Sequence, residues 1–240
     1  MLDILGAIMC AGIYTAQIGV LTGFAAAPSR TKLRGVAAAL VWGAGVVLVA
    51  ALGGFREGAT GVLPAPVLAF GALLALLLGG FALSQRFRHA MLSIPLPALV
   101  GLNAARTGGI MFILLGAAGR LSSPFAPAAG GGDILVGVLA IPVALLAARH
   151  ASRHTALIGA WNVLGALDLV MAITIALLSS PGLPFRVFMD GQGTLVMTGL
   201  PWIMVPALIV PFYFLIHLTV AAKLKALQPV RGELTVARAH

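Results

Sequence analysis

Seven long runs of apolar residues follow one another along the chain, separated by short segments that are polar or rich in glycine and proline. A hydrocarbon core about 30 Å thick requires roughly 20 consecutive helical residues, and most of the runs approach or exceed that length. Outer-membrane strands would instead alternate apolar and polar residues, whereas residues 136–148 contain no polar side chain. The pattern predicts an all-α bundle of seven transmembrane helices: about 3–26, 35–54, 63–84, 92–118, 133–149, 155–178 and 197–222.

The fourth and fifth runs are the least regular. The fourth opens with Pro95 and Pro97, so we expect its first turns to be irregular, and the fifth is short. No stretch between the runs is long enough to form a second domain. We therefore expect one transmembrane domain over residues 1–222, followed by a short basic tail over residues 223–240.

Positively charged residues concentrate in alternate loops. Eleven Lys and Arg fall in the first, third and fifth loops and the tail, against three in the other loops. Cytoplasmic loops retain Lys and Arg, so this bias predicts an N-terminus outside and a C-terminus in the cytoplasm. The eleven are Arg30, Lys32, Arg34, Arg86, Arg88, Arg149, Arg153, Lys223, Lys225, Arg231 and Arg238, and the three are Arg56, Arg120 and Arg186.

Composition narrows the class of protein further. Hydrophobic residues make up 60% of the chain and charged residues only 9%, although the net charge is +9. Average chains carry roughly a quarter charged residues, so this share argues against a nucleic-acid-binding protein. The positive charge is better explained by topology and by contact with anionic lipid head groups, and membrane lipids are the partners we expect.

Five polar residues lie deep inside the predicted helices. At 1.5 Å per residue, Arg106 lies about 18 Å and Asp168 about 15 Å below the N-terminal side of the membrane. An unpaired charge at that depth costs at least about 2.5 kcal/mol, so we expect the two side chains to be in direct or one-water contact. Asn103, Asn162 and Gln17 lie at similar levels. We predict a polar cluster between the first, fourth and sixth helices.

Two interpretations of this cluster stay open. Ionisable residues inside a membrane mark sites for substrates, ions or protons, which favours a non-enzymatic protein that binds or moves a small polar or ionic solute. A buried ion pair can also serve only to hold helices together. The alternative function is therefore a structural or partner-binding membrane subunit.

A short glycine motif raises a third alternative. The pattern Gly130-x-Gly132-Asp133 resembles the G-x-G-D signature of intramembrane aspartyl proteases, which need a second aspartate close enough to share a proton. Asp168 is the other deep carboxylate, but it lies about 15 Å lower if the fifth helix begins at Asp133. An aspartyl-type hydrolase is thus the weakest of the three functions, and we expect Asp133 to cap its helix at the outer surface.

The positions of the histidines and the absence of cofactor-binding motifs indicate whether a cofactor is expected. His89, His150, His154 and His217 are all expected near the cytoplasmic face, where interfacial histidines explain them, although haem or metal binding there stays open. The seventh helix has no lysine that could form a Schiff base with retinal. The sequence also lacks nucleotide-binding loops, so we expect no cofactor.

Residues from about 90 to 220 resemble a group of uncharacterised bacterial multi-pass inner-membrane proteins. The resemblance implies a bacterial inner membrane and the same helical bundle, and it implies no known activity. Ser123-Pro124 stands where Leu-Pro would be expected. The matching pieces are Arg106-x-x-Gly109-x-x-Phe112, Pro124-Phe125-Ala126, Gly130-x-Gly132-Asp133, Trp161-Asn162-x-x-Gly165-x-x-Asp168 and the series Pro201, Pro206 and Pro211.

Overall fold

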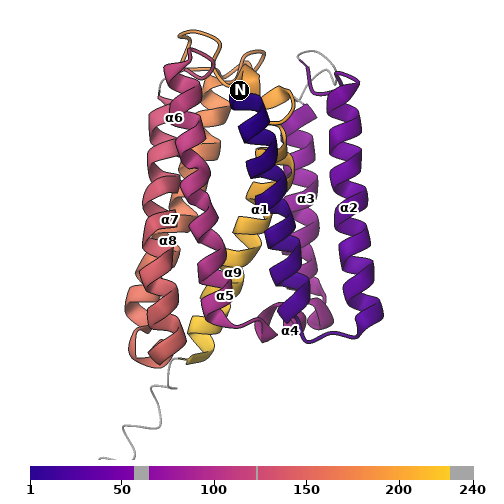
Figure 1. Cartoon of the computed structure of the whole chain (residues 1–240), viewed down its shortest axis with the longest axis vertical. Helices are drawn as coiled ribbons and strands as arrows, with labels where there is room; N and C mark the ends of the chain where they lie inside the picture. Colours follow the sequence, from indigo (N-terminus) through magenta and orange to yellow (C-terminus); the bar gives the residue numbers. More distant parts are fainter. Residues whose placement is uncertain (57–64, 123, 228–240) are drawn as a thin grey trace, which may run out of the picture.

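Seven apolar helical segments run side by side along the long axis of the computed structural model, which describes residues 1–56, 65–122 and 124–227 (Figure 1). The predicted all-α class and the count of seven candidate spans are confirmed, and the described residues contain no strand. The spans are α1 (Leu2–Phe24), α2 (Ser29–Ala51), α3 (Ala65–Leu83), Leu96–Ala117, Phe125–Arg153, α8 (Thr155–Ser179) and Val205–Leu227.

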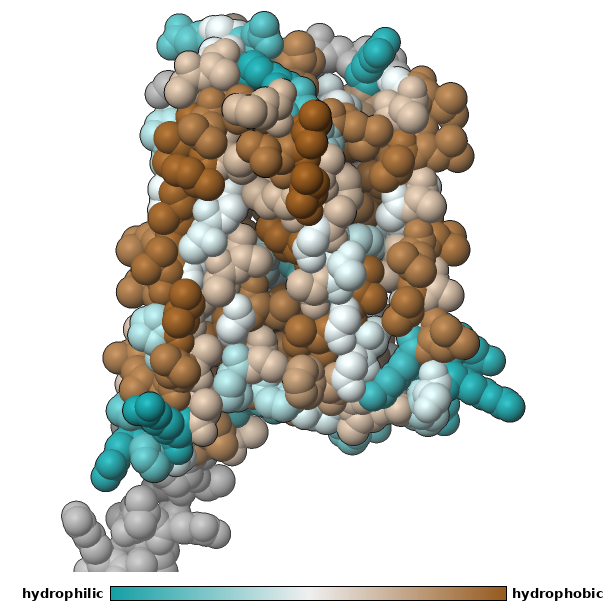
Figure 2. Space-filling model, viewed as in Figure 1, coloured by the Kyte–Doolittle hydropathy of each residue, from teal (hydrophilic) through white to brown (hydrophobic). Residues whose placement is uncertain are grey.

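The two ends of the bundle differ in charge. The N-terminal end holds Met1 and the segments 52–56, 118–122 and 180–204, whereas the other end holds residues 25–28, α4 (Gln85–Ser93) and the turn after α7 (Phe125–His150). Nine of the described Lys and Arg lie at this second end, which we call the basic end, against three at the N-terminal end. Between the two ends, the face drawn in Figure 2 is largely apolar.

Several helices begin or end away from the predicted residues. α2 begins at Ser29 rather than residue 35, and the seventh span continues to Leu227, so Lys223 and Lys225 are helical and do not belong to a tail. The remainder of the predicted tail lies outside the described residues. α4 was not predicted as a separate helix, and it begins where Ser84 Oγ accepts a hydrogen bond from the Phe87 amide over 3.3 Å.

The predicted fourth run is interrupted at its start, where Ile94 and Pro95 are not helical, and also at its centre. α5 (Leu96–Leu102) and α6 (Ile110–Ala117) are joined by the 3₁₀ segment η1 (Asn103–Gly109). A 3₁₀ stretch in the middle of a helix is uncommon and often accompanies function or strain. η1 is the segment that carries Arg106.

The seventh span is not one continuous helix from residue 197. The predicted run opens near the short η3 (Leu195–Thr198) and passes through turns, and the span itself begins with the π segment η4 (Val205–Ile209) and continues as α9 (Val210–Leu227). Pro211 has no N–H to donate to the Ala207 carbonyl four residues earlier. Trp42 Nε1 of α2 donates to that carbonyl over 3.1 Å, and Gln17 Nε2 of α1 donates to the Ile209 carbonyl over 3.2 Å.

The fifth span begins earlier than predicted. α7 runs from Phe125 to His150, so the triple glycine of residues 130–132 lies inside a helix and not in a loop. Small residues allow transmembrane helices to approach closely, and this helix uses them against η1. A Cβ on Gly137 would lie only 2.6 Å from the Thr107 amide nitrogen, and one on Gly109 would lie 2.5 Å from Asp133 Cβ.

This packing predicts opposite effects at two glycines of α7. Gly137→Ala should lower the free energy of unfolding by about 1–3 kcal/mol, because the added methyl meets the η1 backbone. Gly131→Ala is the matched control, since its Cβ would meet nothing within 4 Å, and alanine favours helix by up to about 1 kcal/mol. Thermal unfolding in one detergent compares the two. Equal melting temperatures would contradict the close packing of α7 on η1.

Candidate functional site

The guanidinium of Arg106 lies at the centre of the bundle between two carboxylates. Its Nε donates to Asp133 Oδ1 over 2.7 Å, and its Nη2 pairs with Asp168 Oδ2. The Arg106 side chain is 1% exposed, that of Asp168 is 6% exposed and that of Asp133 is 18% exposed. η1, α7 and α8 thus each contribute one charged residue to this site.

The remaining face of the guanidinium is also occupied. Nη1 donates to the Gly165 carbonyl over 3.1 Å and lies 3.3 Å from His217 Nε2. The Tyr213 ring lies beneath the cation, with its centroid 5.6 Å from Arg106 Cζ, a cation–π distance. Four of the five N–H donors of Arg106 therefore have protein partners.

A pair of reciprocal hydrogen bonds orients His217. Asn162 Nδ2 donates to the His217 carbonyl over 3.2 Å, and Asn162 Oδ1 lies 2.9 Å from His217 Nδ1. Because the amide oxygen only accepts, His217 carries its proton on Nδ1, which leaves Nε2 to accept from Arg106. Asn162 thus belongs to the cluster through the imidazole and not through direct contact with the charges.

Glycines bring these polar groups together. A Cβ on Gly132 of α7 would overlap Asp168 Oδ1, and a Cβ on Gly165 of α8 would lie 2.5 Å from His217 Cε1. Both positions therefore require a residue without a side chain. The G-x-G-D motif serves here to let α8 approach α7.

The charges of the cluster do not balance when both carboxylates are ionised. Arg106 supplies one positive charge, and Asp133 and Asp168 supply two negative charges. Among the described residues, no second Lys or Arg forms an ion pair with either carboxylate. An excess negative charge in a low-dielectric interior is costly, so the arrangement favours a proton or a cation at this site.

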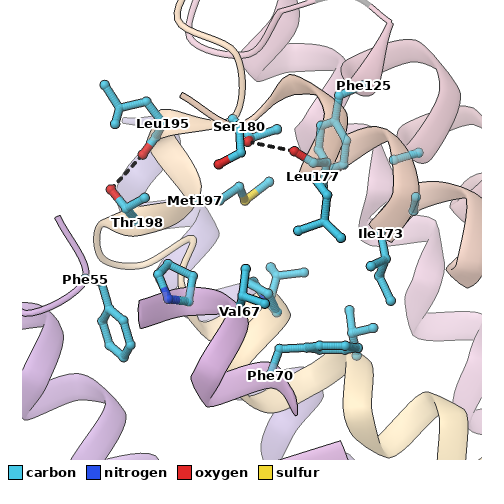
Figure 3. A pocket seen from close by; sticks show the side chains of 18 of the residues that line it. Phe55, Val67, Phe70, Phe125, Ile173, Leu177, Ser180, Leu195, Met197 and Thr198 are labelled. Atoms are coloured by element: carbon cyan, nitrogen blue, oxygen red, sulfur yellow. Dashed lines mark hydrogen bonds between the residues drawn. The ribbon is translucent and has the colours of Figure 1, made fainter. Parts of the chain in front are cut away.

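Two cavities adjoin Asp133. The larger one, of about 260 Å³, lies near the N-terminal end between α3, α8, residues 180–198 and the start of the seventh span (Figure 3). The smaller one, of about 40 Å³, lies beside Arg106 and has room for a few water molecules. Five residues line both cavities: Phe112, Asp133, Leu169, Val205 and Val210.

Two residues of the predicted cluster lie apart from the charges. Asn103 donates to the Leu99 carbonyl of its own helix over 3.2 Å, and Gln17 donates to the Ile209 carbonyl. Both are buried, but neither forms a hydrogen bond with Arg106 or Asp168. Counting residues along a helix predicts depth and could not show the direction in which either side chain points.

The predicted position of Asp133 is wrong. Asp133 does not cap α7, because that helix begins at Phe125, eight residues earlier, which carries the carboxylate about 12 Å into the bundle. There it binds Arg106, as Asp168 does. Each carboxylate is held by a different nitrogen of one guanidinium, an arrangement unlike a dyad in which two aspartates share a proton.

His217 was also misplaced in the prediction. It lies at the Arg106 cluster and not near the face that holds the other histidines, because residues 199–204 form turns and add little depth. Its spacing of four residues from Tyr213, on one face of a helix, is the signal that could have identified it. Within residues 1–56, 65–122 and 124–227, no group of three His, Cys, Asp or Glu side chains is placed to hold a metal ion.

Seven candidate spans around a buried ion-pair cluster form the architecture of a multi-pass membrane protein. The domain of unknown function DUF8737 matches residues 63–225, which is more than half of the chain, and the chain belongs to this family. Among the described residues, the matched region contains every hydrogen-bond and cation–π partner of the Arg106 side chain, and it excludes α1 and α2. No curated protein and no solved structure matches the chain.

The three charges predict an unequal set of mutational effects. Arg106→Ala should lower stability by about 3–5 kcal/mol, because it leaves two carboxylates without a cation. Asp168→Asn should cost less, since Arg106 and Asp133 remain as a neutral pair. A double-mutant cycle, measured by thermal unfolding in detergent, should give a non-additive coupling of about 1–3 kcal/mol.

The exposed pair of Arg120 with Asp3 at the N-terminal end is the control. Its side chains are 37% and 50% exposed, so Arg120→Ala should change stability by at most about 1 kcal/mol. Strictly additive losses at Arg106 and Asp168, or equal losses for the two single variants, would contradict a shared three-charge cluster.

Proposed function

We propose that the protein lies in a bacterial inner membrane with its N-terminus outside and its C-terminus in the cytoplasm. Nine of the described Lys and Arg lie at the basic end, against three at the other end, and this bias supports the orientation. The resemblance of the Arg106, Asp133 and Asp168 segments to bacterial multi-pass proteins supports the choice of membrane.

Within that membrane, we propose that the protein binds or moves a small polar or ionic solute at the Arg106 cluster. The observation that carries this proposal is the excess carboxylate: Asp133 brings an unbalanced negative charge to a point where two cavities meet. A cluster that only held helices together would be cheaper with one carboxylate and one cation.

Irregular helical segments in two spans support the same function. η1 interrupts the fourth span at its centre, and the π segment η4 opens the seventh span. Discontinuous helices near the middle of the bilayer, as at η1, are typical of solute and ion sites in transporters, because their free backbone groups can face the solute.

The structural alternative also has support. Arg106 already uses four of its five donors on protein groups, and Gly132 and Gly165 permit close contact around it. A site that never exchanges its partners would have these same features. A measurement of water access to the larger cavity therefore distinguishes a solute site from a purely structural cluster.

The orientation predicts the outcome of reporter fusions. Green fluorescent protein fused to the C-terminus of the full chain should fluoresce, because it would lie in the cytoplasm, and alkaline phosphatase fused there should be inactive. Alkaline phosphatase fused after Asp190 in a truncated chain should be active. The reverse pair of results would overturn the orientation.

Solute access predicts the labelling of one engineered cysteine. In a Cys10→Ser background, which removes the one native cysteine, Ala172→Cys places a thiol on the wall of the larger cavity. A trimethylammonium methanethiosulfonate reagent added to spheroplasts should label this thiol, because a solute site needs an aqueous route. Mass spectrometry of the purified protein measures the yield.

Two further cysteine variants serve as controls for this labelling. Val170→Cys lies on the same helix but outside the cavity lining, where its 50% exposed side chain faces away from the pocket, and a charged reagent should not reach it through lipid. Ala140→Cys is fully buried and should also stay unlabelled. An unreactive Ala172→Cys would reject the solute site and favour the structural alternative.

A further inference from the structure

We infer that the larger cavity binds a compact organic monocation, with an apolar body against the cavity wall and its cationic group directed toward Asp133. This inference rests on the proposed solute site and adds the chemical class of the solute. Three observations carry it: the apolar lining of the cavity, the charge at its inner end and the two aromatic rings, Phe112 and Phe125, among the lining residues.

The lining of the larger cavity suits a ligand that is mostly apolar. Most of its lining side chains are aliphatic, aromatic or thioether groups, and Figure 3 shows several of them directed into the same space. A cavity of about 150 Å³ holds one benzene molecule, so about 260 Å³ suits a ligand of roughly ten non-hydrogen atoms. Representative lining residues are Phe55, Val67, Phe70, Ile173, Leu177 and Met197.

Asp133, at the inner end of the cavity, favours a positively charged ligand. Its side chain lines the cavity and is still 18% accessible, and Arg106 Nε is its one hydrogen-bond donor among the described residues. With Arg106 shared between two carboxylates, the cluster lacks one positive charge when both carboxylates are ionised. A monocation beside Asp133 supplies that charge, whereas an anion would add to the imbalance.

Arg56 lines the cavity as well, but it does not change the sign. Its side chain is exposed at the N-terminal end, where water and salt screen its charge, whereas Asp133 acts from the buried end with little screening. Its removal should leave the affinity for a cation unchanged or raise it.

Two aromatic rings in the lining of the larger cavity suit an ammonium group. Phe112 and Phe125 both line the cavity, and their ring centroids lie 5.7 Å apart with the planes inclined at 55°. The faces of such rings attract cations, most strongly where water is excluded. A lipid acyl chain would fit the apolar wall equally well but would leave the negative charge of the cluster unbalanced.

The test compares three small molecules of nearly the same shape. Benzyltrimethylammonium is the cation, neopentylbenzene is its neutral carbon isostere, and benzylsulfonate is the anion. Each is dialysed to equilibrium against phosphatidylcholine nanodiscs with and without the full-length protein, and mass spectrometry measures the protein-dependent uptake. The zwitterionic lipid prevents binding of the cation to the membrane itself.

We expect saturable binding of benzyltrimethylammonium, at least tenfold tighter than that of neopentylbenzene, and no binding of benzylsulfonate. Asp133→Asn should lower the affinity for the cation at least tenfold and leave that for the neutral compound unchanged. Ala172→Leu fills the cavity without touching the cluster and should abolish binding of the cation, whereas Val170→Leu, outside the lining, should retain it. Circular dichroism melting establishes that each variant is folded.

Three results would overturn the inference: equal affinity for the cation and its neutral isostere, unchanged cation binding in Asp133→Asn, or binding that survives Ala172→Leu. Equal binding of the neutral compound would identify the occupant as an uncharged apolar chain. Labelling of Ala172→Cys together with failure of cation binding would reject the monocation and keep the solute site. Failure of the labelling itself would reject the solute site.

Discussion

The burial of one guanidinium in the middle of the bundle determines how four of the segments must pack. Arg106 cannot remain unpaired in a low-dielectric interior, so α7, α8 and α9 must all present polar groups to η1 at one level. Such groups converge only if the helices approach closely, which explains why Gly132, Gly137 and Gly165 have no room for a side chain. The glycine pattern and the charged cluster are thus two parts of one constraint.

The two segments that depart from α-helical geometry, η1 and η4, both lie beside Arg106. η1 carries the arginine, and η4 contains a proline and is followed by another, so the carbonyls around it need donors from outside the span. Trp42 of α2 donates to the Ala207 carbonyl, which Pro211 cannot serve, and Gln17 of α1 adds a hydrogen bond to the nearby Ile209 carbonyl. α1 and α2 lie outside the DUF8737 match, and they therefore stabilise η4, which lies inside it.

Hydrophobic run length was sufficient to predict the helical class and the number of candidate spans, because lipid demands that length from any sequence. Counting residues from the ends of the predicted helices also placed Arg106 and Asp168 at a similar depth, and in the structure the two side chains form an ion pair. The counting failed for Asp133 and His217, because their depth depends on where a helix begins. Glycines that weaken helices in water were interpreted as a loop before Asp133, and turns before η4 were interpreted as helix. Sequence spacing also could not show that Asn103 and Gln17 point toward other partners.

The positions of the Arg106 partners along the chain give the cluster an order of assembly. Asp133 follows Arg106 by 27 residues, Asp168 by 62 and His217 by 111. During synthesis the fourth span thus emerges from the ribosome with an arginine that has no partner, at a cost of about 2.5–3.5 kcal/mol for insertion on its own. Its first counter-ion arrives with the very next span, so the α5–α7 hairpin can enter the bilayer as a neutral unit. The second carboxylate then joins a pair that is already neutral.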